Sequence, residues 1–270
     1  MIAKNKIFLV TGAGGGIGSE LALALLERGA KVAAIDLRNE GLEELKKRAG
    51  DKAESLTTHI LDITDRTAVE DLPKDIIAKQ GNIDAIINNA GIIQPFVRIN
   101  DLEYDAIDKV MKVNFYGTLY ITKTFLPMLL KRPEAHIINV SSMGGFLPVP
   151  GQSIYGASKA AVKLLTEGLY AELLGTNVHV SIVFPGATNT HIAENSGAGM
   201  PEPAVNTTKQ KSFPMLPAKE AARIIVDDIE KNKPQIFTGN DSKMMNFLYR
   251  LNPVSATKLI ANQMKSLLPK

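Results

Sequence analysis

The chain of 270 residues contains no cysteine and no tryptophan, and aromatic residues make up only 6% of it. Without cysteine there are no disulfides, no thiolate metal site and no cysteine nucleophile. A lack of disulfides fits a reducing compartment, and we therefore expect a cytoplasmic protein. The four histidines show no metal-ligand spacing, so no metal site is predicted.

Long apolar runs are also missing. The longest uncharged stretch, residues 135–158, is interrupted by Asn, Ser, Gly and Pro, which excludes an apolar membrane-spanning helix. The apolar run at Ile7–Val10 is too short for a signal peptide and predicts a buried strand. The net charge of +3 is too small to predict nucleic-acid binding.

What the chain does contain is a regular alternation of short apolar runs and helical patterns. Continuous apolar runs are typical of strands buried on both faces of a parallel sheet. We predict an α/β fold with a Rossmann-like, doubly wound parallel sheet of about seven strands, in a single domain over residues 1–270. The expected strands are 6–11, 31–36, 55–60, 83–88, 135–140, 177–183 and 235–238, and the expected helices are 17–28, 39–49, 67–79, 103–130, 153–174 and 219–231.

Two segments depart from this alternation. Residues 187–218 are rich in Pro and Gly and too long for an ordinary connection, which predicts a substrate lid rather than a disordered insertion. Residues 241–268 form two apolar helical stripes with interspersed basic residues, split by Pro253. This helical tail could pack over the substrate pocket or a neighbouring subunit, lie on an anionic membrane surface, or dock a partner. We favour packing, and treat peripheral membrane contact as the less favoured alternative.

A glycine-rich turn joins the first strand to the first helix. Gly12, Gly16 and Gly18 let the backbone approach a ligand closely, and the helix start offers free N–H groups to a pyrophosphate. This arrangement predicts a dinucleotide site. Asp36 ends the second strand, where a carboxylate accepts hydrogen bonds from the ribose of NAD and repels the extra phosphate of NADP. Arg38 is near enough in sequence to soften that preference.

Tyr155 and Lys159 are four residues apart and share one helix face. Tyrosine has a pKa near 10, so it is a poor acid–base catalyst at neutral pH. A neighbouring ammonium group would lower that pKa, which makes the pair a candidate for proton transfer.

The motifs occur in a characteristic order: Thr11 and the glycines, Asn88 to Gly91, Asn114, Ser141-Ser142, Tyr155-x-x-x-Lys159 and Pro185-Gly186. Over residues 5 to about 240 this set resembles the short-chain dehydrogenase/reductase family in its single-domain branch. The resemblance implies that Tyr155 is the general acid/base, that Lys159 tunes it, that Ser142 orients the substrate oxygen, and that Asn114 holds a water for proton relay. It further implies cofactor contacts from Gly12, Gly16, Ile17, Gly18, Asp36, Asp62, Ile63, Asn89, Ala90, Gly91, Tyr155, Lys159, Pro185, Gly186, Thr188 and Thr190.

The resemblance implies an oxidoreductase that interconverts a secondary alcohol and a ketone by hydride transfer, with NAD as cofactor. The alternatives are an NADPH-dependent ketoacyl or carbonyl reductase and a non-catalytic protein that binds the nicotinamide cofactor or a partner. The expected pocket walls, residues 92–98 and 143–152, are mostly apolar and predict an apolar substrate. The resemblance also implies a homo-oligomer, a dimer or tetramer.

Overall fold

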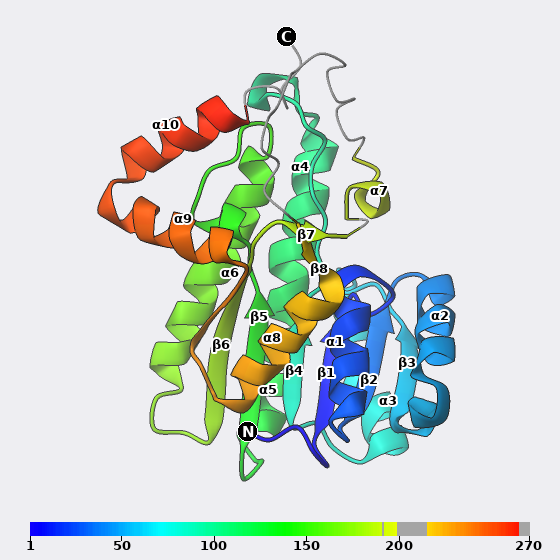
Figure 1. The fold of residues 1–270 in the computed structure, drawn as a ribbon. Coiled ribbons are helices and arrows are strands. Elements are labelled where there is room, and N and C mark those ends of the chain that lie inside the picture. The colour runs from blue at the N-terminus through cyan, green and yellow to red at the C-terminus, as the bar shows by residue number, and fades with distance from the viewer. Residues whose placement is uncertain (191, 199–214, 265–270) are drawn as a thin grey trace.

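The computed structural model describes residues 1–190, 192–198 and 215–264. Its centre is a seven-stranded, fully parallel sheet with the order β3-β2-β1-β4-β5-β6-β9 (Figure 1). The predicted α/β fold and strand number are thus confirmed. The strands are β1 (Ile7–Thr11), β2 (Lys31–Asp36), β3 (Leu56–Ile60), β4 (Ala85–Asn88), β5 (Ala135–Val140), β6 (Val178–Pro185) and β9 (Gln235–Thr238).

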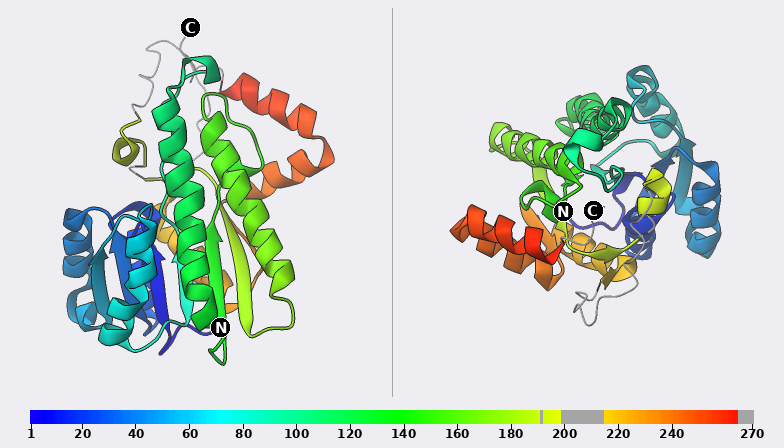
Figure 2. Two further views of the ribbon diagram at one scale, coloured as in Figure 1. Left: turned by 180° about the vertical axis from the view of Figure 1, so that it is seen from behind. Right: turned by 90° about the horizontal axis from the view of Figure 1, so that it is seen from above.

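Helices cover both faces of this sheet, as its doubly apolar strands require (Figure 2). One buried cluster joins the sheet to α1 (Gly16–Glu27), α2 (Asn39–Ala49) and α8 (Ala218–Glu230). The cluster on the other face joins it to α3 (Arg66–Gln80), α5 (Thr118–Leu129) and α6 (Ser153–Glu172). The result is a three-layer molecule whose strands end together at one edge of the sheet.

The predicted helix over residues 103–130 is interrupted. It consists of α4 (Tyr104–Met111), a π-helical segment (Lys112–Gly117) and α5. A π-helical segment widens the backbone by one residue and often lies at a functional site. Here it contains Asn114, whose backbone carbonyl accepts a hydrogen bond from Thr118 Oγ1 at 2.9 Å. The prediction of one regular helix was therefore wrong at the position of a candidate site residue.

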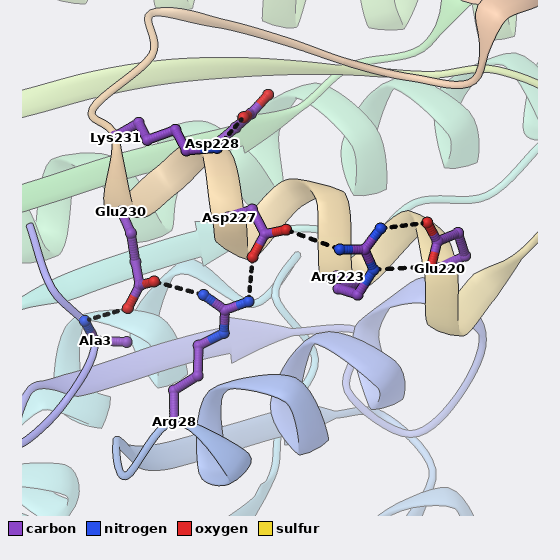
Figure 3. A network of polar contacts seen from close by, with 8 residues as sticks. All are labelled: Ala3, Arg28, Glu220, Arg223, Asp227, Asp228, Glu230 and Lys231. Atoms are coloured by element: carbon purple, nitrogen blue, oxygen red, sulfur yellow. Dashed lines mark hydrogen bonds and ion pairs between the residues drawn. The ribbon is translucent and has the colours of Figure 1, made fainter.

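Charged side chains tie α1 to α8 (Figure 3). The Arg28 guanidinium pairs with Asp227 and, at 2.5 Å, with Glu230. Glu230 also accepts a hydrogen bond from the backbone N–H of Ala3 at 3.0 Å. Asp227 is shared with Arg223, which lies one turn earlier on α8. The network fixes the end of α1 and the N-terminal segment against the same helix.

The remaining elements lie at the carboxyl edge of the sheet or beside it. The short strands β7 (Thr188–Asn189) and β8 (Leu216–Pro217) pair, and α7 (Ile192–Ser196) follows β7. The predicted lid, 187–218, includes these elements, but residues 191 and 199–214 lie outside the described residues. No helix of the described chain is long and apolar enough to cross a membrane.

The C-terminal part of the chain is helical, as predicted. It forms α9 (Asn240–Leu251) and α10 (Pro253–Gln263), and the Asn252 side chain caps α10 by accepting from Ser255 N–H at 2.9 Å. Met245, Ala256 and Ile260 bury one side of this pair against Leu147. Residues 265–268 of the predicted tail lie outside the described residues.

Candidate functional site

The glycine-rich turn leads directly into α1, and no described side chain caps that helix. Its first N–H groups are therefore open to a ligand at the positive end of the helix dipole. Gly12 has a left-handed φ of +66°, and a Cβ on Gly18 would lie 2.0 Å from the Gly12 carbonyl oxygen. These two glycines make the turn possible by close packing, which leaves the helix start free to bind a diphosphate.

Thr11, the last residue of β1, and Asn89, which follows the neighbouring strand β4, hold this turn in place. The Asn89 side-chain amide donates to the backbone carbonyls of Thr11 at 3.0 Å and Gly12 at 3.3 Å. Thr11 Oγ1 accepts from the backbone N–H groups of Asn89 and Ala90. These hydrogen bonds therefore connect the loop after β4 to the glycine-rich turn.

Asp36 lies at the end of β2, beside the glycine-rich turn. Its carboxylate accepts hydrogen bonds from the backbone N–H of Gly14 at 2.9 Å and of Arg38 at 3.0 Å. The Arg38 side chain extends over the same region, with Nε 3.9 Å from an Asp36 oxygen and Nη1 2.8 Å from Asn195 Oδ1 of α7. One carboxylate and one guanidinium therefore face the position expected for the ribose.

Tyr155 and Lys159 lie on α6, as their spacing predicts. Lys159 is 4% exposed, and its Nζ donates to the Val140 carbonyl at 3.0 Å. Burial lowers the pKa of Lys159 to about 8. Burial also raises the pKa of Tyr155, and a hydrogen bond with Ser142 opposes that rise. Desolvation is the largest effect on both groups in the protein without its cofactor, so the lowering of the Tyr155 pKa by Lys159 and the oxidised nicotinamide stays a prediction for the cofactor-bound protein.

Asn114 is fully buried, and its side chain is occupied by protein groups. Its amide donates to the Ile92 carbonyl and to Ser158 Oγ, both at 2.9 Å, and its oxygen accepts from Ile92 N–H at 2.8 Å. The side chain thus joins the π-helical segment to α6 and to the loop after β4. The water-holding role that the resemblance implies for Asn114 stays a prediction.

Gln94 lies within the expected pocket wall 92–98, but it does not line the cavity and instead supports the first turn of α6. Its side chain is fully buried, and Oε1 accepts from the backbone N–H groups of Ile154 at 2.7 Å and Tyr155 at 3.1 Å. Its own carbonyl accepts from Gln152 Nε2 at 2.8 Å. Gln94 therefore caps the helix that carries Tyr155. It belongs to no motif, and only the three-dimensional contact identifies it.

A single cavity of about 480 Å³ connects the glycine-rich turn, Asp36 and Tyr155. Nearly every site residue expected from the sequence lines it: Gly12, Gly16, Ile17, Asp36, Asp62, Ile63, Asn89, Ala90, Gly91, Ser142, Tyr155, Lys159, Pro185, Gly186, Thr188 and Thr190. Gly18 and Asn114 do not, because they act inside the protein framework. The cavity is also lined by residues that are not among the cofactor contacts implied by the resemblance: Gly15, Arg38, Lys109, Val113, Ile192 and Asn195.

The expected substrate walls are only partly where we predicted them. Ile92 lines the cavity. Leu147 is completely buried, in the cluster with Met245 and Ile260, and Phe146 packs against the same cluster. These two side chains support the C-terminal helices instead of lining the cavity. Among the described residues, no group of three or more His, Cys, Asp or Glu side chains could hold a metal ion.

Residues 6–201 match the model of a family described as short chain dehydrogenase. A Thermotoga maritima protein named 3-oxoacyl-[acyl-carrier-protein] reductase FabG is 35% identical over 209 residues, which cover 77% of this chain and 82% of the relative.

Solved structures agree on the fold. A Burkholderia phymatum short chain dehydrogenase/reductase in complex with NAD has a TM-score of 0.82 at 24% identity, covering 94% of this chain and 96% of that one. A Burkholderia cenocepacia short chain dehydrogenase in complex with NADP has a TM-score of 0.78 at 27% identity, with 96% and 99% covered.

Proposed function

Because the chain belongs to the short-chain dehydrogenase/reductase family, and is thus an oxidoreductase that uses a nicotinamide cofactor, we propose that it interconverts a secondary alcohol and a ketone with NAD(H). One observation carries this proposal. A single cavity brings the open start of α1, the Asp36 carboxylate and the Tyr155–Ser142 pair to one continuous surface. A dinucleotide needs the first two features, and proton transfer at a substrate oxygen needs the third.

The bound nicotinamide cofactor supplies the hydride chemistry. The open N–H groups at the start of α1 would hold its diphosphate, and Lys159 lines the same cavity beside Gly91. In the oxidation direction, the Tyr155 phenolate takes the proton from the substrate hydroxyl; the Lys159 ammonium and a positively charged oxidised nicotinamide would stabilise this phenolate. In reduction, the Tyr155 phenol returns the proton to the ketone oxygen. Ser142 Oγ is hydrogen-bonded to Tyr155 and orients the same substrate oxygen.

Asp36 supports NAD over NADP. Its two carboxylate oxygens are held by the Gly14 and Arg38 N–H groups, so the charge is fixed at the ribose position. A 2′-phosphate there would be repelled. Arg38 favours the second candidate, an NADPH-dependent ketoacyl or carbonyl reductase, since its guanidinium lines the same cavity and could pair with that phosphate.

A fluorescence titration with NADH and with NADPH, following the nicotinamide emission, separates the two candidates. We expect tighter binding of NADH, and we expect Asp36→Ala to improve NADPH binding. The matched variant Arg38→Ala should leave the Kd of NADH nearly unchanged. Tighter binding of NADPH by the unaltered protein, lost in Arg38→Ala, would establish the reductase candidate instead.

The substrate class follows from the cavity walls. Apolar side chains such as Ile92, Val113 and Ile192 line the cavity, together with two lysines, Lys109 and Lys159. Arg98, a sequence candidate for binding a carboxylate, is not among the lining residues. We therefore propose an apolar alcohol or ketone. A screen of uncharged and carboxylated substrates of equal size tests this, with preference for the carboxylated series as the contrary result.

The non-catalytic alternative has its own test. Tyr155→Phe should abolish turnover while leaving the Kd of NADH nearly unchanged, because the phenol hydroxyl carries the proton and not the cofactor. Binding of NADH without turnover of any alcohol or ketone by the unaltered protein would favour a cofactor-binding or partner-docking role.

We also propose a homo-oligomer, since large apolar side chains are exposed on α4 and α6. Leu164 and Tyr170 on α6 and Tyr104 on α4 are examples. Sedimentation equilibrium measures the mass directly, and a monomer at all concentrations would contradict this part of the proposal.

A further inference from the structure

The C-terminal helix pair has a second apolar face that the protein itself leaves uncovered. Phe247, Leu251 and Val254 are 62, 68 and 64% exposed, and Met244 is 46% exposed. Met244, Phe247 and Leu251 follow the i, i+3, i+7 spacing of one helix face on α9. Val254 begins the next helix immediately beyond the corner at Asn252 and Pro253. Figure 1 shows α9 and α10 standing out from the sheet layers.

The exposed face of α9 and α10 is distinct from the side of these helices that packs on the rest of the protein. Met245, Ala256 and Ile260 already fill the inner side against Leu147. The Asn252 cap and Pro253 fix the corner between the two helices. The exposed side chains therefore have no remaining apolar surface of the described protein to fold onto. Exposed apolar groups gathered in this way mark an interaction surface.

The charges on the outer face decide what it binds. Lys243, Arg250 and Lys258 are exposed and make no ion pair with any described residue. Asp241 is the single acidic residue of α9 and α10, and its carboxylate accepts from Ala187 N–H at 2.8 Å on the protein side. The outer face is therefore apolar and cationic, without a described carboxylate.

An anionic lipid surface fits this combination. Apolar side chains enter the boundary between headgroups and acyl chains, while lysine and arginine reach the phosphate groups from flexible stems. A second copy of the chain fits less well, because a two-fold contact through this face would set cations opposite cations. We infer that the outer face of α9 and α10 binds the surface of an anionic bilayer, without spanning it.

The experiment is vesicle co-sedimentation of the full chain. Two vesicle types are compared: phosphatidylcholine alone, and phosphatidylcholine with about one third phosphatidylserine. We expect sedimentation only with the anionic vesicles, and release at about 1 M salt, where charges are screened beyond about 3 Å. Absence of binding to the anionic vesicles would overturn the inference.

Two variants locate the binding face. The triple variant Lys243→Glu, Arg250→Glu, Lys258→Glu should reduce partitioning to anionic vesicles about a hundredfold, since each cation near such a surface contributes about fivefold. The variant Phe247→Gln, Leu251→Gln should also release the protein, although its charge is unchanged. The matched control reverses three exposed lysines near α2, on the opposite side of the molecule: Lys46→Glu, Lys47→Glu, Lys52→Glu.

The control should bind like the unaltered protein. Equal loss in control and triple variant would mean that net charge, rather than this face, drives binding, and would overturn the assignment. Sedimentation velocity measures self-association of the chain through the same face. Self-association that is lost in Phe247→Gln, Leu251→Gln, without any vesicle binding, would assign the face to a second copy and also overturn the inference. Unfolding midpoints confirm that the variants remain folded.

Discussion

Gln94 and Tyr155 are joined by a hydrogen bond in which the buried side-chain oxygen of Gln94 accepts from the backbone N–H of Tyr155 at 3.1 Å. The same oxygen accepts from Ile154 N–H, so one amide holds the first turn of α6 in place. Tyr155 must present its hydroxyl to a substrate within hydrogen-bond reach. The position of the proton-transfer group therefore depends on a residue 61 positions earlier in the chain.

Replacing Gln94 should affect turnover more than cofactor binding. Gln94→Met removes the acceptor and keeps the side-chain length, so we expect kcat to fall about ten- to a hundredfold through misplacement of Tyr155. The Kd of NADH should change little, because Gln94 does not line the cavity. Gln94→Glu retains an acceptor for both N–H groups and should recover most of kcat. Parallel losses of kcat and NADH binding in both variants would indicate a general folding defect instead.

Because of Lys159, the free energy of unfolding should increase as the pH rises from 8 to 10.5. Its pKa is about 8 in the folded protein and 10.5 ordinarily, so the unfolded chain binds more protons between these values. Below pH 8 the charged Lys159 lowers the free energy of unfolding by the full amount, and this loss is recovered as the pH rises from 8 to 10.5. At about 1.4 kcal/mol per pKa unit, the gap corresponds to about 3 kcal/mol.

The variant Lys159→Met isolates this effect. Urea unfolding of both proteins across the pH range gives the difference in their free energies of unfolding. We expect the wild type to gain about 3 kcal/mol relative to Lys159→Met between pH 7 and pH 10.5. A constant difference would show that Lys159 keeps its ordinary pKa in the folded protein.

Replacing a glycine of the turn by alanine should lower either the stability of the protein or its affinity for NADH, depending on the position. A Cβ at Gly18 would overlap the backbone of Gly12, so Gly18→Ala should lower the free energy of unfolding by about 3 kcal/mol. Gly15 has an extended backbone, and a Cβ there would have no neighbour closer than 3.9 Å. Gly15→Ala should leave stability nearly unchanged and weaken NADH binding, because Gly15 lines the cavity. Equal loss of stability in both variants would contradict this division.

The link between α1 and α8 should contribute measurably to stability. The Arg28 side chain is 27% exposed, and its removal would leave the Asp227 and Glu230 carboxylates without their shared partner. We expect Arg28→Met to lower the free energy of unfolding by about 1–2 kcal/mol. Arg66→Met removes a solvent-exposed pair with Glu70 and serves as the control, with no measurable change expected. Identical unfolding midpoints for the unaltered protein, Arg28→Met and Arg66→Met would show that the Arg28 ion pairs do not stabilise the fold.

Much of the fold could be predicted because its signals are local. Ile137 and Ile138 lie in a run of apolar residues that only a doubly covered parallel strand explains, and the strand ends then bring Asp36 and Ser142 to one edge. The spacing of Tyr155 and Lys159 also depends only on helix geometry. Such features need no knowledge of distant contacts.

The errors come from contacts between distant segments. The π-helical segment depends on where Asn114 meets Ile92 and Ser158, and nothing in its own sequence marks it. Leu147 is apolar, and its assignment to a substrate wall failed because the C-terminal helices cover it. Local patterns report that a side chain is buried, but not which element buries it.

The pairing of α1 with α8 has a consequence for how the protein is made. Arg28 and Glu230 are separated by 202 positions, and the apolar side of α1 shares its cluster with Ile225 and Ile229. At about 5–20 residues per second, synthesis of the intervening chain takes roughly 10 to 40 s. During that interval β1, β2 and α1 can emerge from the ribosome, while α1 lacks its cover. The apolar side of α1 therefore stays uncovered in the nascent chain until α8 has been synthesised.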